Sequence, residues 1–173
     1  KELLIIGPPG LEEFIKVSGP HLFTGLDFRF TVKEVRPLKE FSVGQLKLVP
    51  YEACHRISDA YGLAVMTSEG VKVGFSGDTA EPCETLLQGL NGVEVLVHEA
   101  TCDEEHSEVC RTYGHSTNFD AAHAAERLSS QALILYHIDE FFNSGLREEA
   151  EEIKARYTFK LYIPSDGEWI SFT

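Results

Sequence analysis

The first half of the chain alternates apolar and polar positions at a period of two, which is typical of strands with one buried face. Short turn-forming sequences separate these segments, and "SEG" (68–70) suits a hairpin turn. Helical spacing of apolar residues over 11–17, just after "GPPG", interrupts the series once. The apolar run at 2–6 predicts a buried strand, and the other predicted strands are 28–35, 45–51, 62–68 and 71–77.

The second half alternates apolar runs of strand length with helical patterns. The predicted strands are 93–99 and 132–138, and the predicted helices are 81–90, 116–130 and 146–157. Thr117 is placed to cap the helix over 116–130, with Asp120 three residues later as an approximate capping box. Residues 159–172 predict two further strands around an Asp-Gly turn.

This order of elements predicts one α/β (α+β) domain, residues 1–173, in which helices pack outside a mixed sheet. No glycine-rich fingerprint follows the first strand, which argues against a Rossmann domain. No repeat, linker or low-complexity segment divides the chain.

Composition narrows the function classes. The net charge is −13, from 28 acidic and 15 basic residues, and such a surface repels phosphate backbones unless positive charge is local. No apolar run has membrane-spanning length, so we expect a cytoplasmic protein with no membrane partner. The four cysteines show no C-x-x-C spacing, and reduced thiols are the expectation. Pairing of Cys102 with Cys110 under oxidation stays open.

Chemistry concentrates at strand ends. Asp78 follows strand 71–77, His98 and Glu99 close strand 93–99, and His137 lies at the end of strand 132–138. Neighbouring parallel strands bring such positions to one edge of a sheet. His55, after strand 45–51, and His115, before the helix over 116–130, complete a cluster of the type that binds Zn²⁺ or a similar divalent metal.

Each of these residues also has a structural interpretation. A single histidine at a strand end is more often hydrogen-bonded than a ligand, and Asp78 alone suits a turn. His98 and Glu99 suit a solvated strand end, and His106, in "CDEEHSEVC", suits a solvated position. The order His55, Asp78, His115 and His137, each in a distinctive setting, is what favours a metal site.

Those settings resemble a known family. "FSGDT" (75–79), "LVHEAT" (96–101), "GHST" (114–117) and "LILYHI" (133–138) resemble, in order, the late motifs of the metallo-β-lactamase superfamily. The branch they resemble is the ribonuclease Z group of tRNA 3′-end endonucleases. "GPPGLEEFI" (7–15) and "IPSDGEWISF" (163–172) resemble flanking segments of the same group, so the resemblance covers essentially the whole chain.

The resemblance implies an αββα sandwich and a hydrolase that uses water activated by two metal ions. By motif, His55 would bind the first metal, His137 the second, and Asp78 would bridge them. His115 would be the general acid or a phosphate-binding histidine, and Glu99 would orient or polarise the site near it. Zinc is the expected metal, two ions per complete site, with manganese and iron as alternatives.

One departure from the family concerns completeness. The family's H-x-H-x-D-H motif, which supplies further ligands and the aspartate that orients the nucleophile, does not occur in these residues. The chain starts at Lys1, within the family's "GPPG" region. We therefore expect the C-terminal portion of the domain, incomplete at its N-terminus and inactive without the segment that carries this motif.

The second departure concerns the substrate. The tRNA enzymes carry a protruding arm between the His55-type and Asp78-type motifs, whereas here residues 56–77 predict one hairpin. The leading hypothesis is therefore a ribonuclease Z-like phosphodiesterase. A true tRNA 3′-end endonuclease acting on a tRNA precursor is the first alternative, and a non-catalytic half-domain is the second. A homodimer stays open.

Overall fold

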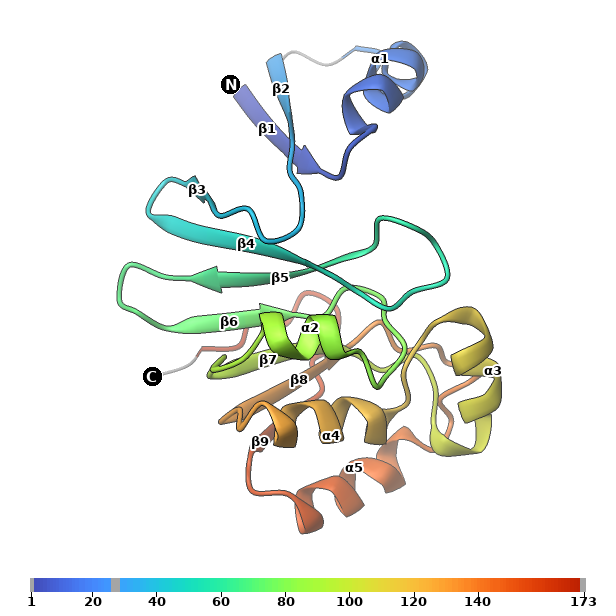
Figure 1. The fold of residues 1–173 in the computed structure, drawn as a ribbon. Coiled ribbons are helices and arrows are strands. Elements are labelled where there is room, and N and C mark those ends of the chain that lie inside the picture. Colours follow the sequence, from blue (N-terminus) through green and yellow to red (C-terminus); the bar gives the residue numbers. More distant parts are fainter. Residues whose placement is uncertain (1, 26–28, 172–173) are drawn as a thin grey trace.

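The computed structural model describes residues 2–25 and 29–171. Within these residues the strands form a two-stranded parallel sheet, β1–β2, and a seven-stranded mixed sheet in the order β3-β4-β5-β6-β7-β8-β9 (Figure 1). The strands are β1 (Glu2–Gly7), β2 (Arg29–Glu34), β3 (Phe41–Val43), β4 (Leu46–Glu52), β5 (Tyr61–Met66), β6 (Lys72–Phe75), β7 (Val95–Glu99), β8 (Ala132–Tyr136) and β9 (Lys160–Tyr162).

The helices connect the strands in a regular way. The α-helices are α1 (Leu11–Leu22), α2 (Glu84–Gly89), α3 (Ser107–Tyr113), α4 (Asn118–Arg127) and α5 (Leu146–Arg156), and a short 3₁₀ helix, η1 (Glu104–His106), precedes α3. The large sheet is antiparallel from β3 to β6 and parallel from β6 to β9. Because α2, α4 and α5 lie on successive crossovers in the same direction, they cover the same face of the sheet (Figure 1).

The core lies between that face and the helices. Leu96, Leu133 and Leu135 are completely buried there, together with Leu86 and Leu90 from α2 and its end. The opposite face is also apolar but only partly covered: Phe75 is 39% exposed, and Val73, Val97 and Ile134 are half-buried. The sheet therefore has one packed face and one apolar face with little cover from the described residues.

The predicted architecture, a mixed sheet with outer helices, is confirmed. The capping box of Thr117 and Asp120 at the start of α4 is present in both directions. The turn at Asp166 and Gly167 forms, but no second strand follows it up to Ser171, so that prediction is wrong for the described residues. The half-exposed β1 also differs from the buried strand that its apolar run predicts, because among the described residues it pairs with β2 alone, in a small separate sheet.

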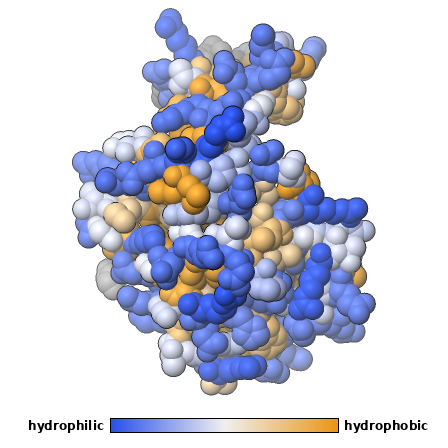
Figure 2. Space-filling model, viewed as in Figure 1, coloured by the Kyte–Doolittle hydropathy of each residue, from blue (hydrophilic) through white to orange (hydrophobic). Residues whose placement is uncertain are grey.

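The surface seen from the helix side is largely hydrophilic with separate apolar patches, in keeping with the net charge of −13 (Figure 2). Among the helices of the described residues, none is long and apolar enough to cross a bilayer.

Candidate metal centre

The predicted site residues converge at one edge of the large sheet. Asp78 follows β6, Glu99 ends β7 and His137 follows β8, and these three neighbouring strands run parallel. Their carboxyl ends therefore meet at the same edge, as expected for α/β sites. His55, from the loop after β4, and His115, between α3 and α4, reach the same place.

The side-chain distances define one centre with His115 in the middle. Ligand atoms of His55, Asp78 and His115 all lie within 4.8 Å of one another, and so do those of Glu99, His115 and His137. The His115 ring centroid lies 4.8 Å from that of His55 and 5.3 Å from that of His137. The Nε2 atom of His137 is 3.9 Å from a carboxylate oxygen of Asp78. All five predicted residues are therefore brought together.

Glu99 is a buried carboxylate that supports this centre. Its side chain is inaccessible to solvent, yet its carboxylate accepts five hydrogen bonds. Oε1 accepts from the backbone N–H of Thr79 at 3.0 Å and from Nδ1 of His115 at 2.9 Å. Oε2 accepts from the N–H and hydroxyl of Thr101, at 3.2 and 2.8 Å, and from the N–H of Ser116 at 3.2 Å. A carboxylate occupied in this way orients its neighbours and has little capacity left to bind a metal.

The three histidines are each held through Nδ1. The Nδ1 atom of His55 donates to the backbone oxygen of Gly114 at 2.8 Å, since a carbonyl can only accept. His115 donates through Nδ1 to Glu99. Because the hydroxyl of Thr101 already donates to Glu99, it accepts from Nδ1 of His137, at 3.0 Å. In all three rings Nε2 is therefore left as the free acceptor, which is the arrangement of metal-binding histidines.

Two backbone features support this geometry. His137 has a φ of 57°, in the left-handed region that non-glycine residues seldom occupy and that is enriched at functional sites. Gly114 has a φ of 83° and closes the C-terminus of α3. A Cβ atom at position 114 would lie 2.6 Å from the backbone nitrogen of Arg56, so only glycine lets the two loops meet so closely.

The interpretation of His98 and Glu99 as a solvated strand end is wrong, because both are buried. The His98 side chain points away from the centre toward Glu81, with 3.5 Å between Nε2 and Oε1. Burial alone would lower the pKa of His98, but interactions with Glu81 and Glu99 together outweigh it, and the pKa is raised above its usual value. His106 is not simply solvated either: its Nδ1 atom lies 2.6 Å from the carboxylate of Asp103.

Sequence reasoning missed Thr101, which links Glu99 to His137. The available signal was its position two residues after Glu99, in "HEAT", where a hydroxyl can reach back to the carboxylate. It also missed Ser116, whose hydroxyl donates to the backbone oxygen of Thr79 at 2.6 Å and joins the "GHST" and "FSGDT" loops. Hydroxyl groups carry no pattern that separates such positions from ordinary surface residues.

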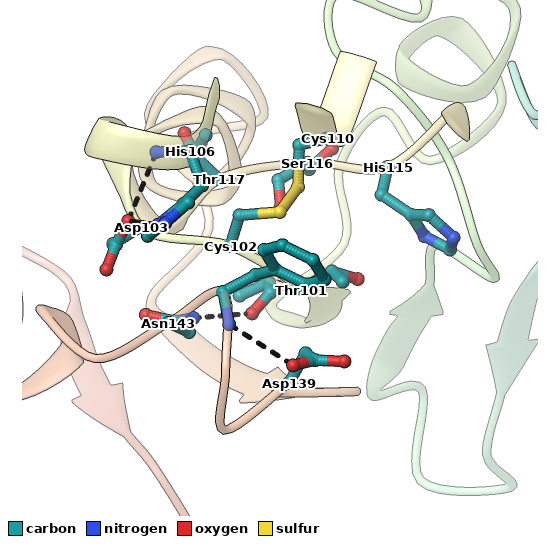
Figure 3. The surroundings of a disulfide bond; sticks show 12 residues. Thr101, Cys102, Asp103, His106, Cys110, His115, Ser116, Thr117, Asp139 and Asn143 are labelled. Atoms are coloured by element: carbon teal, nitrogen blue, oxygen red, sulfur yellow. Dashed lines mark hydrogen bonds and ion pairs between the residues drawn. A yellow bond between two sulfur atoms is a disulfide. The ribbon is translucent and has the colours of Figure 1, made fainter. Parts of the chain in front are cut away.

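The expectation of reduced thiols is wrong, because all four cysteines form disulfides. Cys54, next to His55, pairs with Cys83 just before α2, and the two Cα atoms are 5.5 Å apart. Cys102, next to Thr101, pairs with Cys110 of α3 (Figure 3). Packing of α2 against β4 brings together the first pair, which is 29 residues apart in sequence. Each disulfide therefore ties a site loop to a helix.

The donor set fits a metal of the zinc type. Imidazole Nε2 atoms and one carboxylate are the ligands that catalytic zinc prefers, usually three from the protein with one position left open. Asp78 supports this fit, because no hydrogen bond to its carboxylate is formed by the described residues, and its side chain is 40% exposed. For a second ion, His137 and Asp78 supply two ligands, so a dinuclear site needs donors beyond those seen here.

Comparison with known proteins gives consistent matches. The family described as "Beta-lactamase superfamily domain" matches residues 1–138. A ribonuclease Z of Ignicoccus hospitalis is 30% identical over 88% of this chain and 65% of its own length. The structure of the metallo-beta-lactamase fold protein YhfI from Bacillus subtilis matches 96% of this chain and 64% of that one, with 16% identity and a TM-score of 0.76.

The short form of human tRNase Z gives a TM-score of 0.72 at 23% identity and covers 97% of this chain and 67% of that one. The chain thus spans about two thirds of the length of the relatives that it matches.

Proposed function

Because the chain belongs to the beta-lactamase superfamily, as its motifs predicted, we propose that it is part of a metal-dependent hydrolase, a ribonuclease Z-like phosphodiesterase. The predicted metallo-β-lactamase fold is confirmed by the structural matches. One observation supports the function above the others: ligand atoms of His55 and His115 lie within 4.8 Å of one of Asp78, and Nε2 of His137 lies 3.9 Å from its carboxylate.

The proposed ligands are His55 for one metal, His137 for a second, and Asp78 between them. Zinc is the metal we propose first, with manganese and iron as alternatives. When bound, such ions lower the pKa of water and polarise the phosphoryl oxygens of a phosphodiester. We further propose that residues 1–173 are the C-terminal portion of one domain, and that an H-x-H-x-D-H segment supplies the remaining ligands and is needed for activity.

His115 is proposed as the general acid. Its Nδ1–H is held by Glu99 at 2.9 Å, which leaves Nε2 to deliver the proton that a leaving alkoxide would need. Glu99 therefore fixes the orientation of the ring through this hydrogen bond.

The structure favours a small phosphodiester over a tRNA precursor. Residues 56–77 form β5, β6 and their connections, with no protruding arm. A true tRNA 3′-end endonuclease stays the second candidate, because the curated relatives are named ribonuclease Z. A non-catalytic half-domain is the third, and the intact hydrogen-bond network around Glu99 argues against it.

A cytoplasmic location and a homodimer are part of the proposal. Because disulfides are rare in the cytosol, the two disulfides make the compartment worth testing by thiol titration.

The test measures metal content and hydrolysis together. The protein is assayed, alone and mixed with a segment carrying H-x-H-x-D-H, for bound zinc and for cleavage of bis(p-nitrophenyl) phosphate and of a tRNA precursor. We expect metal binding and cleavage of the small ester to appear or rise on mixing. Preferential cleavage of the tRNA precursor would favour the second candidate. Absence of metal binding in both states would overturn the proposed function.

A further inference from the structure

An arginine and a tyrosine lie together beside the candidate metal centre. Arg56 directly follows His55, and Tyr113 is two residues before His115. The Arg56 guanidinium lies over the Tyr113 ring, with its central carbon 5.8 Å from the ring centroid. We call these two residues the Arg56–Tyr113 pair. Neither residue is in the proposed catalytic set.

The structure holds this pair in a fixed position relative to the histidines. The His55 ring is hydrogen-bonded to the oxygen of Gly114, the residue that follows Tyr113. The absent side chain of Gly114 lets the backbone of Arg56 approach closely. Tyr113 itself ends α3, whose Cys110 is bound by a disulfide to Cys102. The pair is therefore built on the same backbone contacts that position His55 and His115.

The charge of Arg56 is distinguished by its place beside the site, because most other arginines in the described residues also form no ion pair. Arg111 and Arg127 both face carboxylates, Asp120 at 3.7 Å and Glu84 at 2.8 Å. Arg56 forms no ion pair with any carboxylate in the part of the chain that the structure describes. In a molecule of net charge −13, an unpaired guanidinium beside the site is a local attraction for an anion.

The tyrosine adds an exposed aromatic face. Tyr113 is 57% exposed although the ring is large and apolar. Guanidinium groups bind phosphate oxygens through a planar fork, and exposed aromatic rings stack on nucleobases. A phosphate and a base occur together in a nucleotide unit.

We propose that the Arg56–Tyr113 pair is a nucleotide subsite: Arg56 contacts a phosphate and Tyr113 stacks against the base of the same unit. This inference rests on the proposed function and narrows its substrate to phosphodiesters that contain at least one nucleotide. It predicts a preference for nucleotide esters over simple alkyl or aryl esters, even without a tRNA-binding arm.

The test is a comparison of two ligands that differ only in the base. Dissociation constants of adenosine 5′-monophosphate and ribose 5-phosphate are measured by NMR titration on the intact protein supplied with Zn²⁺. We expect the nucleotide to bind about tenfold or more tightly, the range for one stacked base. Tyr113→Leu should reduce this ratio to near one, whereas Tyr113→Phe should keep it. Arg56→Gln should weaken both ligands, and Arg56→Lys should recover only part of the loss.

Arg147→Gln on α5 removes the same charge from an exposed arginine away from the site and serves as the matched control. Equal affinity for the two ligands in the wild type, or a ratio that Tyr113→Leu leaves unchanged, would overturn the subsite. Hydrolysis of bis(p-nitrophenyl) phosphate is measured in parallel on the protein complemented with the H-x-H-x-D-H segment. If that ester is cleaved but the base has no effect, the subsite fails and the proposed function stands. If no ester is cleaved but the base effect is present, the proposed function fails alone.

Discussion

The two outer histidines of the site are held in different ways. On one side, the His55 rim (His55, Arg56 and Gly114), the imidazole is held by a backbone carbonyl at 2.8 Å. On the other, the His137 rim (Thr101 and His137), the imidazole is held by a side-chain hydroxyl at 3.0 Å. His137 is also the more open of the two, with 45% of its side chain exposed.

The difference shows where each rim is vulnerable. A backbone carbonyl cannot be removed by substitution, so the His55 rim depends on the loop path that Gly114 permits. The His137 rim depends on one hydroxyl, which in turn depends on Glu99. His115 lies between the two rims and is held by Glu99 directly. Substitutions can therefore weaken one rim while leaving the other intact.

The largest effect is expected on zinc affinity, when Asp78, the ligand shared by the two rims, is replaced. Asp78→Asn keeps the size of the side chain but removes the charge that both proposed metal positions use. We expect the loss of Zn²⁺ affinity to exceed the 10–100-fold that is typical of an outer-shell change. Stability should change little, because no hydrogen bond to the Asp78 carboxylate is formed by the described residues. Competition with a chromophoric chelator measures the affinity, and an unchanged value would remove Asp78 from the metal site.

Glu99→Gln should weaken His115 and the His137 rim together. The amide cannot accept all five hydrogen bonds, so buried donors lose their partners. We expect a loss of about 2–4 kcal/mol in the free energy of unfolding and a 10–100-fold loss in metal affinity or activity. Urea denaturation and zinc competition measure these two quantities. Glu104→Gln, at an exposed carboxylate that accepts one hydrogen bond from the Thr117 hydroxyl, is the control. Equal losses of stability and zinc affinity in the two variants would show that Glu99 does not orient the metal ligands.

Gly114→Ala should break the His55 rim alone. The new methyl group meets the backbone of Arg56, and the residue must hold a φ of 83°. Gly92→Ala is a matched control, because Gly92 has a φ of 75° and nothing lies within 4 Å of the position that its new methyl group would take. We expect the control to lose about 1–2 kcal/mol of stability from the left-handed backbone and Gly114→Ala to lose more. NMR chemical shifts should change at His55 and not at His137. Equal losses of stability in the two variants would show that the close approach of residue 114 to the Arg56 backbone does not matter.

Thr101→Val is the corresponding change in the His137 rim. It removes the hydroxyl with little change of shape, so His137 loses the acceptor for its Nδ1 proton. We expect the ring to shift toward the Nε2–H tautomer, which nitrogen-15 NMR detects without metal, and zinc affinity to fall about tenfold. Thr101→Ser should restore both the His137 tautomer and the zinc affinity. A His137 tautomer that does not respond would mean that the hydroxyl contact does not set it.

These rims also show what the sequence could and could not predict. Asp78, Glu99 and His137 were predictable because they lie at the ends of neighbouring parallel strands, and His55 and His115 were predictable from the motifs that contain them. The way each ring is held was not, because it depends on a carbonyl, a hydroxyl and a left-handed glycine that belong to loops. The strand predicted after Gly167 does not form up to Ser171, although β9 lies at the edge of the sheet. Its apolar pattern indicates which side chains a strand would bury, but it does not determine whether the backbone pairs.

The smallest effect concerns a pH-dependent support behind the His137 rim. The Asp103 carboxylate accepts from the N–H of Gly145, at 2.8 Å, and from His106, and so ties the loop after Thr101 to the start of α5. The contact with Asp103 raises the pKa of His106. Burial acts to raise the pKa of Asp103, but the hydrogen bonds from Gly145 and His106 outweigh it, and that pKa is lowered.

Both shifts make the stability of the fold depend on pH. The contribution of the raised His106 pKa to the free energy of unfolding is fully present below about pH 6.5 and is lost as the pH rises through the raised value. The contribution of the lowered Asp103 pKa is present above about pH 4 and is lost on acidification. We expect the wild type to exceed His106→Gln in urea midpoint by more at pH 5.5 than at pH 8.5, with the His55 resonances unaffected. A difference that is constant across this range would show that the His106–Asp103 contact does not stabilise the fold.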